Sequence, residues 1–296
     1  MRRLIVGALL LLLLTRAGIA QIAETRRDMV FRKIDGQELK LDLYLPEGEG
    51  PHPIALVIHG GGWFRGSRRS MNATLLVKLL ARDGVAGASI DYRLAPKSPH
   101  PAQIEDCRYA MQWLLANATK FGLDKKKVMA CGASSGGHLA GLLGAQANLA
   151  DPNAKDRIAR ERTRPDCVLS FFGPMDLASD DEETNAAGVR LVKQFLGVRD
   201  RSESALAAAR LASPLHQLAS GAPPFLFIHG KQDRLVPVEQ SHSMARALKK
   251  RGVPSSVLEV RGGHGDFTLL LAASRPGAEP KYWQQARAFL KRHWLK

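Results

Sequence analysis

The chain has 296 residues, of which 45% are hydrophobic and 24% are charged, and its formal net charge is +15. This composition is typical of a globular protein with a substantial core, and the length predicts one domain or two. Only three cysteines occur, widely spaced, which argues against a disulfide framework and against a zinc site. The basic residues are scattered and no aromatic platform accompanies them, so the charge does not indicate a nucleic-acid-binding protein.

The first twenty residues have the pattern of a cleavable signal peptide. Two arginines follow Met1, an apolar run covers 4–14, and the small residues GIA at 18–20 precede the expected cleavage site. The apolar run is short for a membrane span. We therefore expect removal of 1–20, export to the periplasm or the medium, and no stable membrane insertion afterwards. An uncleaved N-terminal anchor is the alternative, because Arg16 lies close to the cleavage site.

Short apolar strands alternate with amphipathic helices along the rest of the chain. The first two strands alternate in polarity around a turn, which predicts an antiparallel hairpin. The later strands are continuous apolar runs, as expected when helices cover both faces of a sheet. This order predicts an α/β fold with a mostly parallel, eight-stranded sheet and helices on both faces. The expected strands are 29–34, 39–45, 54–59, 85–91, 128–131, 167–172, 225–229 and 256–260, and the expected helices are 69–82, 101–121, 136–147, 239–251 and 281–293.

One long connection breaks this alternation. It lies between the strands at 167–172 and 225–229, and it contains two helical pieces, at 185–196 and 202–211. Connections of this length inside a compact domain usually carry a function. We interpret 174–221 as a small cap inserted into a single domain that extends from 21 to 296.

The sequence Gly132-Ala133-Ser134-Ser135-Gly136 lies between an apolar strand and a helix rich in Ala, Leu and Gly. This is a G-x-S-x-G motif in strand–turn–helix context, which is typical of a nucleophile elbow. The turn exposes the serine above the sheet, and the N-terminus of the helix favours developing negative charge. The spacing predicts Ser134 as the nucleophile and the backbone N–H of Ser135 as a donor. A glycine-rich turn with incidental serines is the alternative.

Three glycines follow His59 at the end of the expected strand 54–59, in the sequence HGGGW. Acyl transfer places negative charge on a carbonyl oxygen, which backbone N–H groups must face. Glycines leave such amides accessible, and HGGG loops accompany the nucleophile elbow in esterases and lipases. We predict that Gly61 and Gly62, with Ser135, form the oxyanion hole, and that His59 braces the loop through a hydrogen bond. A tight structural turn is the alternative.

A serine nucleophile requires a base, and the base requires a carboxylate that orients it. In this fold both follow the serine, the acid first. Asp233 comes shortly after the strand at 225–229, and His264, flanked by glycines, follows the strand at 256–260. Both are therefore expected at the carboxyl ends of strands, where open α/β sheets bind ligands. We predict Asp233 as the acid and His264 as the base. The competing residues are Asp176 and Asp266 for the acid, and His138, His216, His229, His242 and His293 for the base.

The motifs HGGGW, GASSGGHLA, HGKQDRLVP and GGHGDF occur here in the order of the α/β-hydrolase superfamily. More narrowly, the chain resembles the secreted esterase and lipase branch that holds bacterial feruloyl and acetyl-xylan esterases of the BD-FAE type. DYRLAP and HPAQIEDCRYAMQWL also match, and the resemblance extends from about Val30 to the C-terminus. Within these motifs we interpret Asp91, Arg93 and Asp106 as structural, an ion pair that ties the helix at 101–121 to the sheet. The related hormone-sensitive-lipase branch usually has GDSAGG where this chain has GASSGG, which favours the BD-FAE type.

The resemblance implies a serine carboxylesterase that hydrolyses short-chain or carbohydrate-linked esters through an acyl-enzyme, without a metal or a cofactor. It implies Ser134, Asp233 and His264 as the triad, and it places Trp63 in the wall of the substrate pocket. A core tryptophan that braces the loop is an equally good interpretation of Trp63. The expected partner is a small-molecule or polysaccharide-linked ester, and the oligomeric state is left open. The rival functions are a serine peptidase or amidase of the same fold and a non-catalytic binding module.

Overall fold

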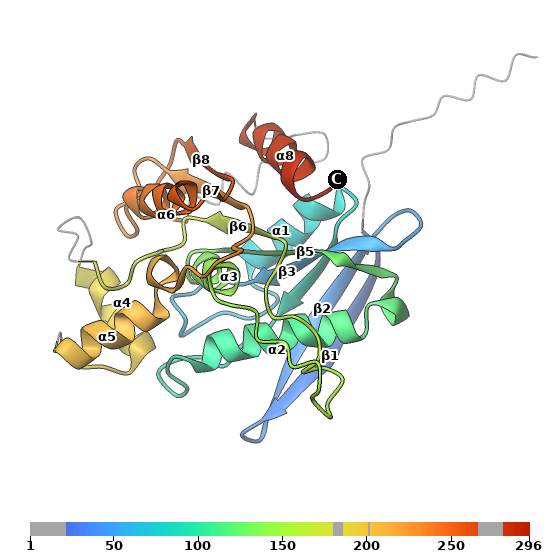
Figure 1. Ribbon diagram of the computed structural model, residues 1–296, viewed down its shortest axis with the longest axis horizontal. Helices are drawn as coiled ribbons and strands as arrows, with labels where there is room; N and C mark the ends of the chain where they lie inside the picture. The colour runs from blue at the N-terminus through green and yellow to red at the C-terminus, as the bar shows by residue number, and fades with distance from the viewer. Residues whose placement is uncertain (1–21, 180–185, 201, 266–280) are drawn as a thin grey trace, which may run out of the picture.

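The computed structural model describes residues 22–179, 186–200, 202–265 and 281–296, so the predicted signal peptide lies outside the described residues. An eight-stranded sheet forms the centre of the molecule, in the order β1-β2-β4-β3-β5-β6-β7-β8 (Figure 1). β2 pairs antiparallel with β1 and with β4, and every other neighbouring pair is parallel. The predicted α/β fold and its initial hairpin are confirmed. The strands are β1 (Ile22–Ile34), β2 (Gln37–Pro46), β3 (His52–Ile58), β4 (Ala86–Ile90), β5 (Leu123–Ala133), β6 (Cys167–Phe171), β7 (Phe225–Gly230) and β8 (Ser255–Val260).

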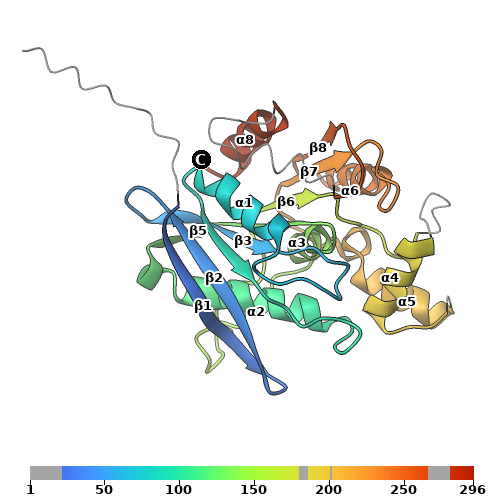
Figure 2. The same cartoon turned by 180° about the vertical axis from the view of Figure 1, so that it is seen from behind.

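Helices cover both faces of the sheet, as the apolar strands require. α1 and α8 pack on one face, and α2, α3 and α6 pack on the other (Figures 1 and 2). α4 and α5 contact each other at one end of the molecule and lie in the segment predicted as a cap. None of the helices in the described ranges is long and apolar enough to cross a membrane. The helices are α1 (Met71–Ala81), α2 (Ala102–Ala116), α3 (Ser135–Ala145), α4 (Ala186–Leu196), α5 (Glu203–Ala212), α6 (Glu239–Lys250) and α8 (Lys281–His293).

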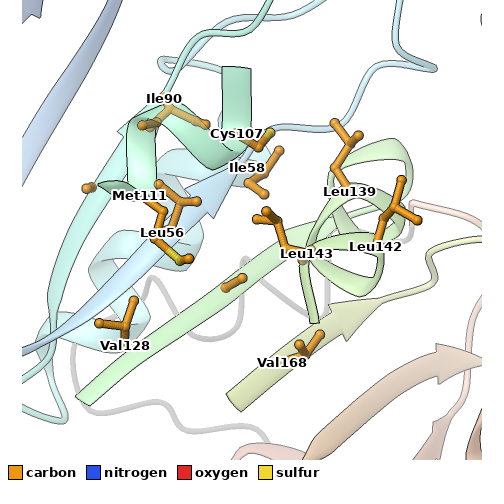
Figure 3. Packing of buried hydrophobic residues seen from close by; sticks show 14 of the residues in the cluster. Leu56, Ile58, Ile90, Cys107, Met111, Val128, Leu139, Leu142, Leu143 and Val168 are labelled. Atoms are coloured by element: carbon orange, nitrogen blue, oxygen red, sulfur yellow. The ribbon is translucent and has the colours of Figure 1, made fainter. Parts of the chain in front are cut away.

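The central strands divide their side chains between two apolar cores. Along β3, Leu56 and Ile58 belong to the core under α2 and α3, and Val57 belongs to the core under α1 and α8. Figure 3 shows Leu139 and Leu143 of α3 beside Ile58. Each such buried side chain stabilises the fold by about 1.5–3 kcal/mol relative to exposure. The elements that carry the candidate site are therefore fixed from both sides.

Of the strands, β1 and β5 begin earliest relative to the prediction, because backbone pairing extends each of them beyond its apolar run. β1 begins at Ile22, where polar residues pair with β2, and β5 begins at Leu123, which pairs with His52 of β3. The helix predicted over 101–121 ends early, since α2 stops at Ala116 and a 3₁₀ turn follows it.

The predicted ion pair between α2 and the sheet is confirmed for two of its three residues. Arg93 Nε lies 2.9 Å from Oδ2 of Asp106, a fully buried residue of α2, and Arg32 of β1 binds the other oxygen of that carboxylate. The assignment of Asp91 to this pair is wrong. Asp91 follows the end of β4, and its carboxylate accepts the backbone N–H of Arg68 at 2.8 Å and binds the guanidinium of the same residue.

Candidate active site

Ser134 occupies a sharp turn between a central strand and the helix behind it. β5 ends at Ala133 and α3 begins at Ser135, so Ser134 alone makes the turn. Its φ of 54° and ψ of −123° are unfavourable for a residue with a side chain. Its backbone N–H donates to the carbonyl of Phe171 in β6 at 2.8 Å, which holds the turn. Strain of this kind is the geometry of a nucleophile elbow.

The glycine after the serines is required by close packing. A Cβ on Gly136 would lie 2.0 Å from the carbonyl oxygen of Ile58 and 2.7 Å from that of His59. Any side chain there would separate α3 from the end of β3. The glycine thus brings the elbow against the strand from which the HGGGW loop departs.

The structure brings the three predicted residues Ser134, His264 and Asp233 into one chain of hydrogen bonds. Ser134 Oγ lies 2.9 Å from His264 Nε2, and His264 Nδ1 lies 2.8 Å from Asp233 Oδ2. A carboxylate only accepts, so Nδ1 carries the proton and Nε2 is free to accept from the serine. The ring of Phe172 contacts the imidazole edge-on, with 5.1 Å between ring centres.

Asp233 is nearly buried and is ionised. Both Leu235 and Val236 donate their backbone N–H groups to Oδ1, at 3.0 and 2.9 Å, and His229 Nε2 lies 3.3 Å from Oδ2. Burial alone would raise the pKa of this carboxyl, but the hydrogen bonds from His229 and His264 outweigh it and hold the pKa well below its ordinary value. A fixed negative charge therefore faces the imidazole of His264.

The competing candidates that the structure describes have other partners. His216 Nε2 lies 3.1 Å from Asp176 Oδ1, and His242 Nε2 lies 2.9 Å from a carboxylate oxygen of Glu259. His229 and His138 are buried, and His293 lies on α8 beside the ring of Phe289. Asp266 lies outside the described residues. Of the carboxylates in the described ranges, Asp233 alone is within hydrogen-bond distance of His264.

The HGGGW loop curls over the elbow with two glycines at positive φ. Gly61 has φ 135°, and a Cβ there would lie 2.1 Å from the carbonyl oxygen of Arg65. Gly62 and Ser134 both line one pocket. Among the described residues, no acceptor takes the amide hydrogens of Gly61 and Gly62. These amides are therefore available to a ligand.

His59 braces this loop, as predicted. Its Nδ1 lies 2.9 Å from the carbonyl oxygen of Gly60, and its ring stacks on Tyr92 with 4.2 Å between ring centres. The hydroxyl of Tyr92 donates to the carbonyl of His59 at 3.0 Å. Burial lowers the pKa of His59 to about 4, so its imidazole is neutral at pH 7.

Trp63 combines the two interpretations that the sequence left open. It contributes to the wall of the pocket beside Ser134, yet it is only 4% exposed. Its ring stacks on Phe195 of α4 with 4.5 Å between ring centres, and its indole N–H donates to His138 Nδ1 at 3.1 Å. Sequence reasoning treated His138 only as a competing base. Its place in the GASSGGHLA motif, one helical turn after Ser134, was the signal of a link to the site.

An apolar pocket opens at Ser134. The side chains of α4 and α5 form one side of it, and the segments 174–179 and 235–240 form the other. The few polar groups belong to Asp176, Ser179, Lys193, Asp200 and Gln240, and most of the remaining wall is Leu, Val, Ala and Pro. A pocket of this kind favours the hydrocarbon part of a ligand.

The buried histidines should make the protein less stable in mild acid. Burial lowers the pKa of His59 to about 4 and that of His138 to about 3, from an ordinary 6.5. Between pH 6.5 and 4 the unfolded chain therefore binds protons that the folded chain excludes. The free energy of unfolding decreases as the pH is lowered through this range. At pH 5 the loss is about 2 kcal/mol for each histidine. The loss of stability can be measured as the decrease in melting temperature between pH 7.5 and pH 5. The variant His138→Gln should show a shallower decline, and a slope equal to that of the wild type would contradict the assignment.

The chain is similar to known esterases in sequence and in structure. Esterase LipC of Mycobacterium tuberculosis is 37% identical over 227 residues, which cover 74% of this chain and 54% of LipC. The chain spans about half the length of the curated relatives that it matches first. The solved structure of an esterase from Thermogutta terrifontis, Est2 with propionate bound, has a TM-score of 0.70 at 26% identity, over 91% of this chain and 93% of that one.

A truncated carbohydrate esterase from gut microbiota has a TM-score of 0.77 at 23% identity, over 92% of this chain and 96% of that one, and shows that the fold is shared. The family model of BD-FAE matches residues 41–248. This range holds the HGGGW loop, the serine elbow and Asp233. The protein therefore has the α/β-hydrolase fold and belongs to the BD-FAE family.

Proposed function

We propose that the protein is a carboxylic ester hydrolase that acts through an acyl-enzyme on Ser134. The hydrogen-bond chain from Ser134 through His264 to the ionised Asp233 is the observation that carries this proposal. It supplies a nucleophile, a base and an orienting acid in the geometry that acyl transfer requires. The names of LipC and Est2 as esterases support the same reaction.

The proposed reaction follows from the protonation states of these groups. His264 Nε2 accepts the hydroxyl proton while Ser134 Oγ attacks the ester carbonyl. The ionised Asp233 stabilises the imidazolium that forms. The carbonyl oxygen becomes negative within reach of the unengaged amides of Gly61 and Gly62 and of the N–H of Ser135. His264 then protonates the leaving alcohol, and water repeats the sequence to release the acid.

The apolar pocket at Ser134 supports an ester with a hydrocarbon or aromatic acyl part. Leu177, Val192, Leu206 and Leu235 are among its lining residues, and apolar side chains outnumber the polar ones in its wall. A carbohydrate-linked substrate would therefore place its acyl group in this pocket and its sugar outside it. We further propose that 1–20 direct export, and that 174–221, which hold α4 and α5, act as a cap that shapes the pocket.

A serine-reactive fluorophosphonate probe and a pair of matched substrates test the proposal. The probe should label Ser134, as peptide mass spectrometry would show. Para-nitrophenyl esters from acetate to octanoate should be hydrolysed, and the matching anilides should react far more slowly. Preference for the anilides would favour the amidase. Failure to label a protein that is folded by circular dichroism would favour the binding module.

A further inference from the structure

One buried histidine joins the HGGGW loop to the end of α5. His138 lies on α3, one turn after Ser134, and is fully buried. Its Nδ1 faces the indole N–H of Trp63 at 3.1 Å, and its Nε2 faces the carbonyl oxygen of Ala212 at 2.8 Å. The indole can only donate and the carbonyl can only accept, so the ring is a neutral imidazole with its proton on Nε2.

Aromatic packing reinforces these two hydrogen bonds. Phe195 of α4 stacks on the ring of Trp63, with 4.5 Å between ring centres and 19° between the planes. His138 meets both rings edge-on, at 5.2 Å from Trp63 and 5.6 Å from Phe195. The indole is thus fixed on its face by α4 and at its N–H by α3, and it has little freedom to rotate.

The backbone of Trp63 depends on this fixation. Its φ is 67°, which is unfavourable for a bulky side chain, and its carbonyl accepts the N–H of Ala95 at 3.0 Å. Such a conformation persists only where surrounding contacts enforce it. Trp63 follows Gly62 directly, so a rotation of its backbone would also move the neighbouring amides of Gly61 and Gly62, which we predict to face the oxyanion.

We infer that His138 is a positioning residue for the proposed ester hydrolysis. It holds the indole of Trp63, and through Trp63 it keeps the amides of Gly61 and Gly62 directed at the reacting carbonyl. Its second bond, to Ala212, ties the end of α5 to α3. The inference rests on the proposed function. His138 itself forms no hydrogen bond to the side chains of Ser134, His264 or Asp233.

Two amide substitutions separate the two hydrogen bonds of His138. Asparagine can place an acceptor near the position of Nδ1, so His138→Asn keeps the bond from Trp63 and loses the bond to Ala212. Glutamine can place a donor near the position of Nε2, so His138→Gln does the reverse. Each variant loses one buried hydrogen bond and should lose a similar part of its thermal stability.

The two variants should differ in catalysis. Because a small displacement of catalytic groups costs about 10²-fold in rate, kcat for a p-nitrophenyl ester should fall by about that factor in His138→Gln, with KM little changed. His138→Asn should keep most of kcat. The affinity for a boronic acid, which mimics the tetrahedral intermediate, should fall in parallel with kcat. A role in stability alone would lower kcat equally in both variants, and that result would overturn the inference.

Trp63→Phe gives a second test that does not alter α3. It removes the indole N–H and keeps a ring to stack on Phe195, so its kcat should fall as in His138→Gln. The double variant that combines Trp63→Phe with His138→Gln should be no slower than either single variant. Each of these three proteins lacks the same hydrogen bond between Trp63 and His138. Additive losses would contradict the inference. An active wild type with no difference between the variants would overturn only the role of His138, whereas an inert wild type would overturn the proposed function as well.

Discussion

Replacing Ser134 by alanine should lower kcat for a p-nitrophenyl ester by about 10⁶-fold, because no group can then form the acyl-enzyme. The oxyanion amides and the pocket stay in place, so a residual rate above that of water should persist. Substrate binding should change little. The experiment measures kcat and KM of both proteins with the same ester, and labelling by a fluorophosphonate should disappear together with turnover.

The neighbouring serine provides the matched control. Ser135→Ala removes a buried hydroxyl and keeps the backbone N–H that the mechanism uses. It should lose far less activity than Ser134→Ala, and the probe should still label it. Equal loss in the two variants would mean that the effect reflects damage to the elbow and not removal of the nucleophile.

Replacing Asp233 by asparagine should lower kcat by about 10⁴-fold. The carboxylate now accepts from His264 Nδ1 at 2.8 Å, which leaves Nε2 free to accept the serine proton. An asparagine amide can donate to Nδ1 instead and would place the imidazole proton on Nε2, the wrong tautomer for a base. The imidazolium would also lose its counter-charge. Steady-state kinetics with a short ester measure the loss, and circular dichroism checks the fold.

Asp176 is the natural comparison for this experiment. It follows β6 as Asp233 follows β7, and on sequence alone both were candidates for the acid. Its carboxylate binds His216 at 3.1 Å. Asp176→Asn should therefore retain much more activity than Asp233→Asn. The reverse order would transfer the role of the acid to Asp176.

The sequence predicted most of the sheet because the strands from β3 to β7 are continuous apolar runs between helices. The first residues of β1 could not be predicted, since Glu24 and Arg26 pair with β2 while their side chains stay outside the core. The partner of Asp91 could not be predicted either, because it depends on how the chain turns after β4. Both the start of β1 and the partner of Asp91 depend on contacts between segments that are separate in the sequence. A local sequence pattern does not reveal such contacts.

The same distinction holds within the site. Ser134, Asp233 and His264 stand in motifs whose order along the chain already indicates a triad, and the geometry brings them together. His138 also stands in the GASSGGHLA motif, but the order of the motifs assigns it no role. Its importance arises from contacts with Trp63 and with Ala212, which are far from it in the sequence, and only the folded structure shows them.

The way in which α4 and α5 are attached also bears on how the proposed activity could be re-engineered. Their side chains supply much of the pocket wall, so their exchange for those of a relative is a way to change selectivity. Two attachment points are different: the ring of Phe195 on Trp63, and the carbonyl of Ala212 on His138. We expect a graft that preserves both contacts to keep the proposed oxyanion amides in place. A graft that loses the contact with Trp63 should hydrolyse esters about 10²-fold more slowly, whatever its new pocket selects.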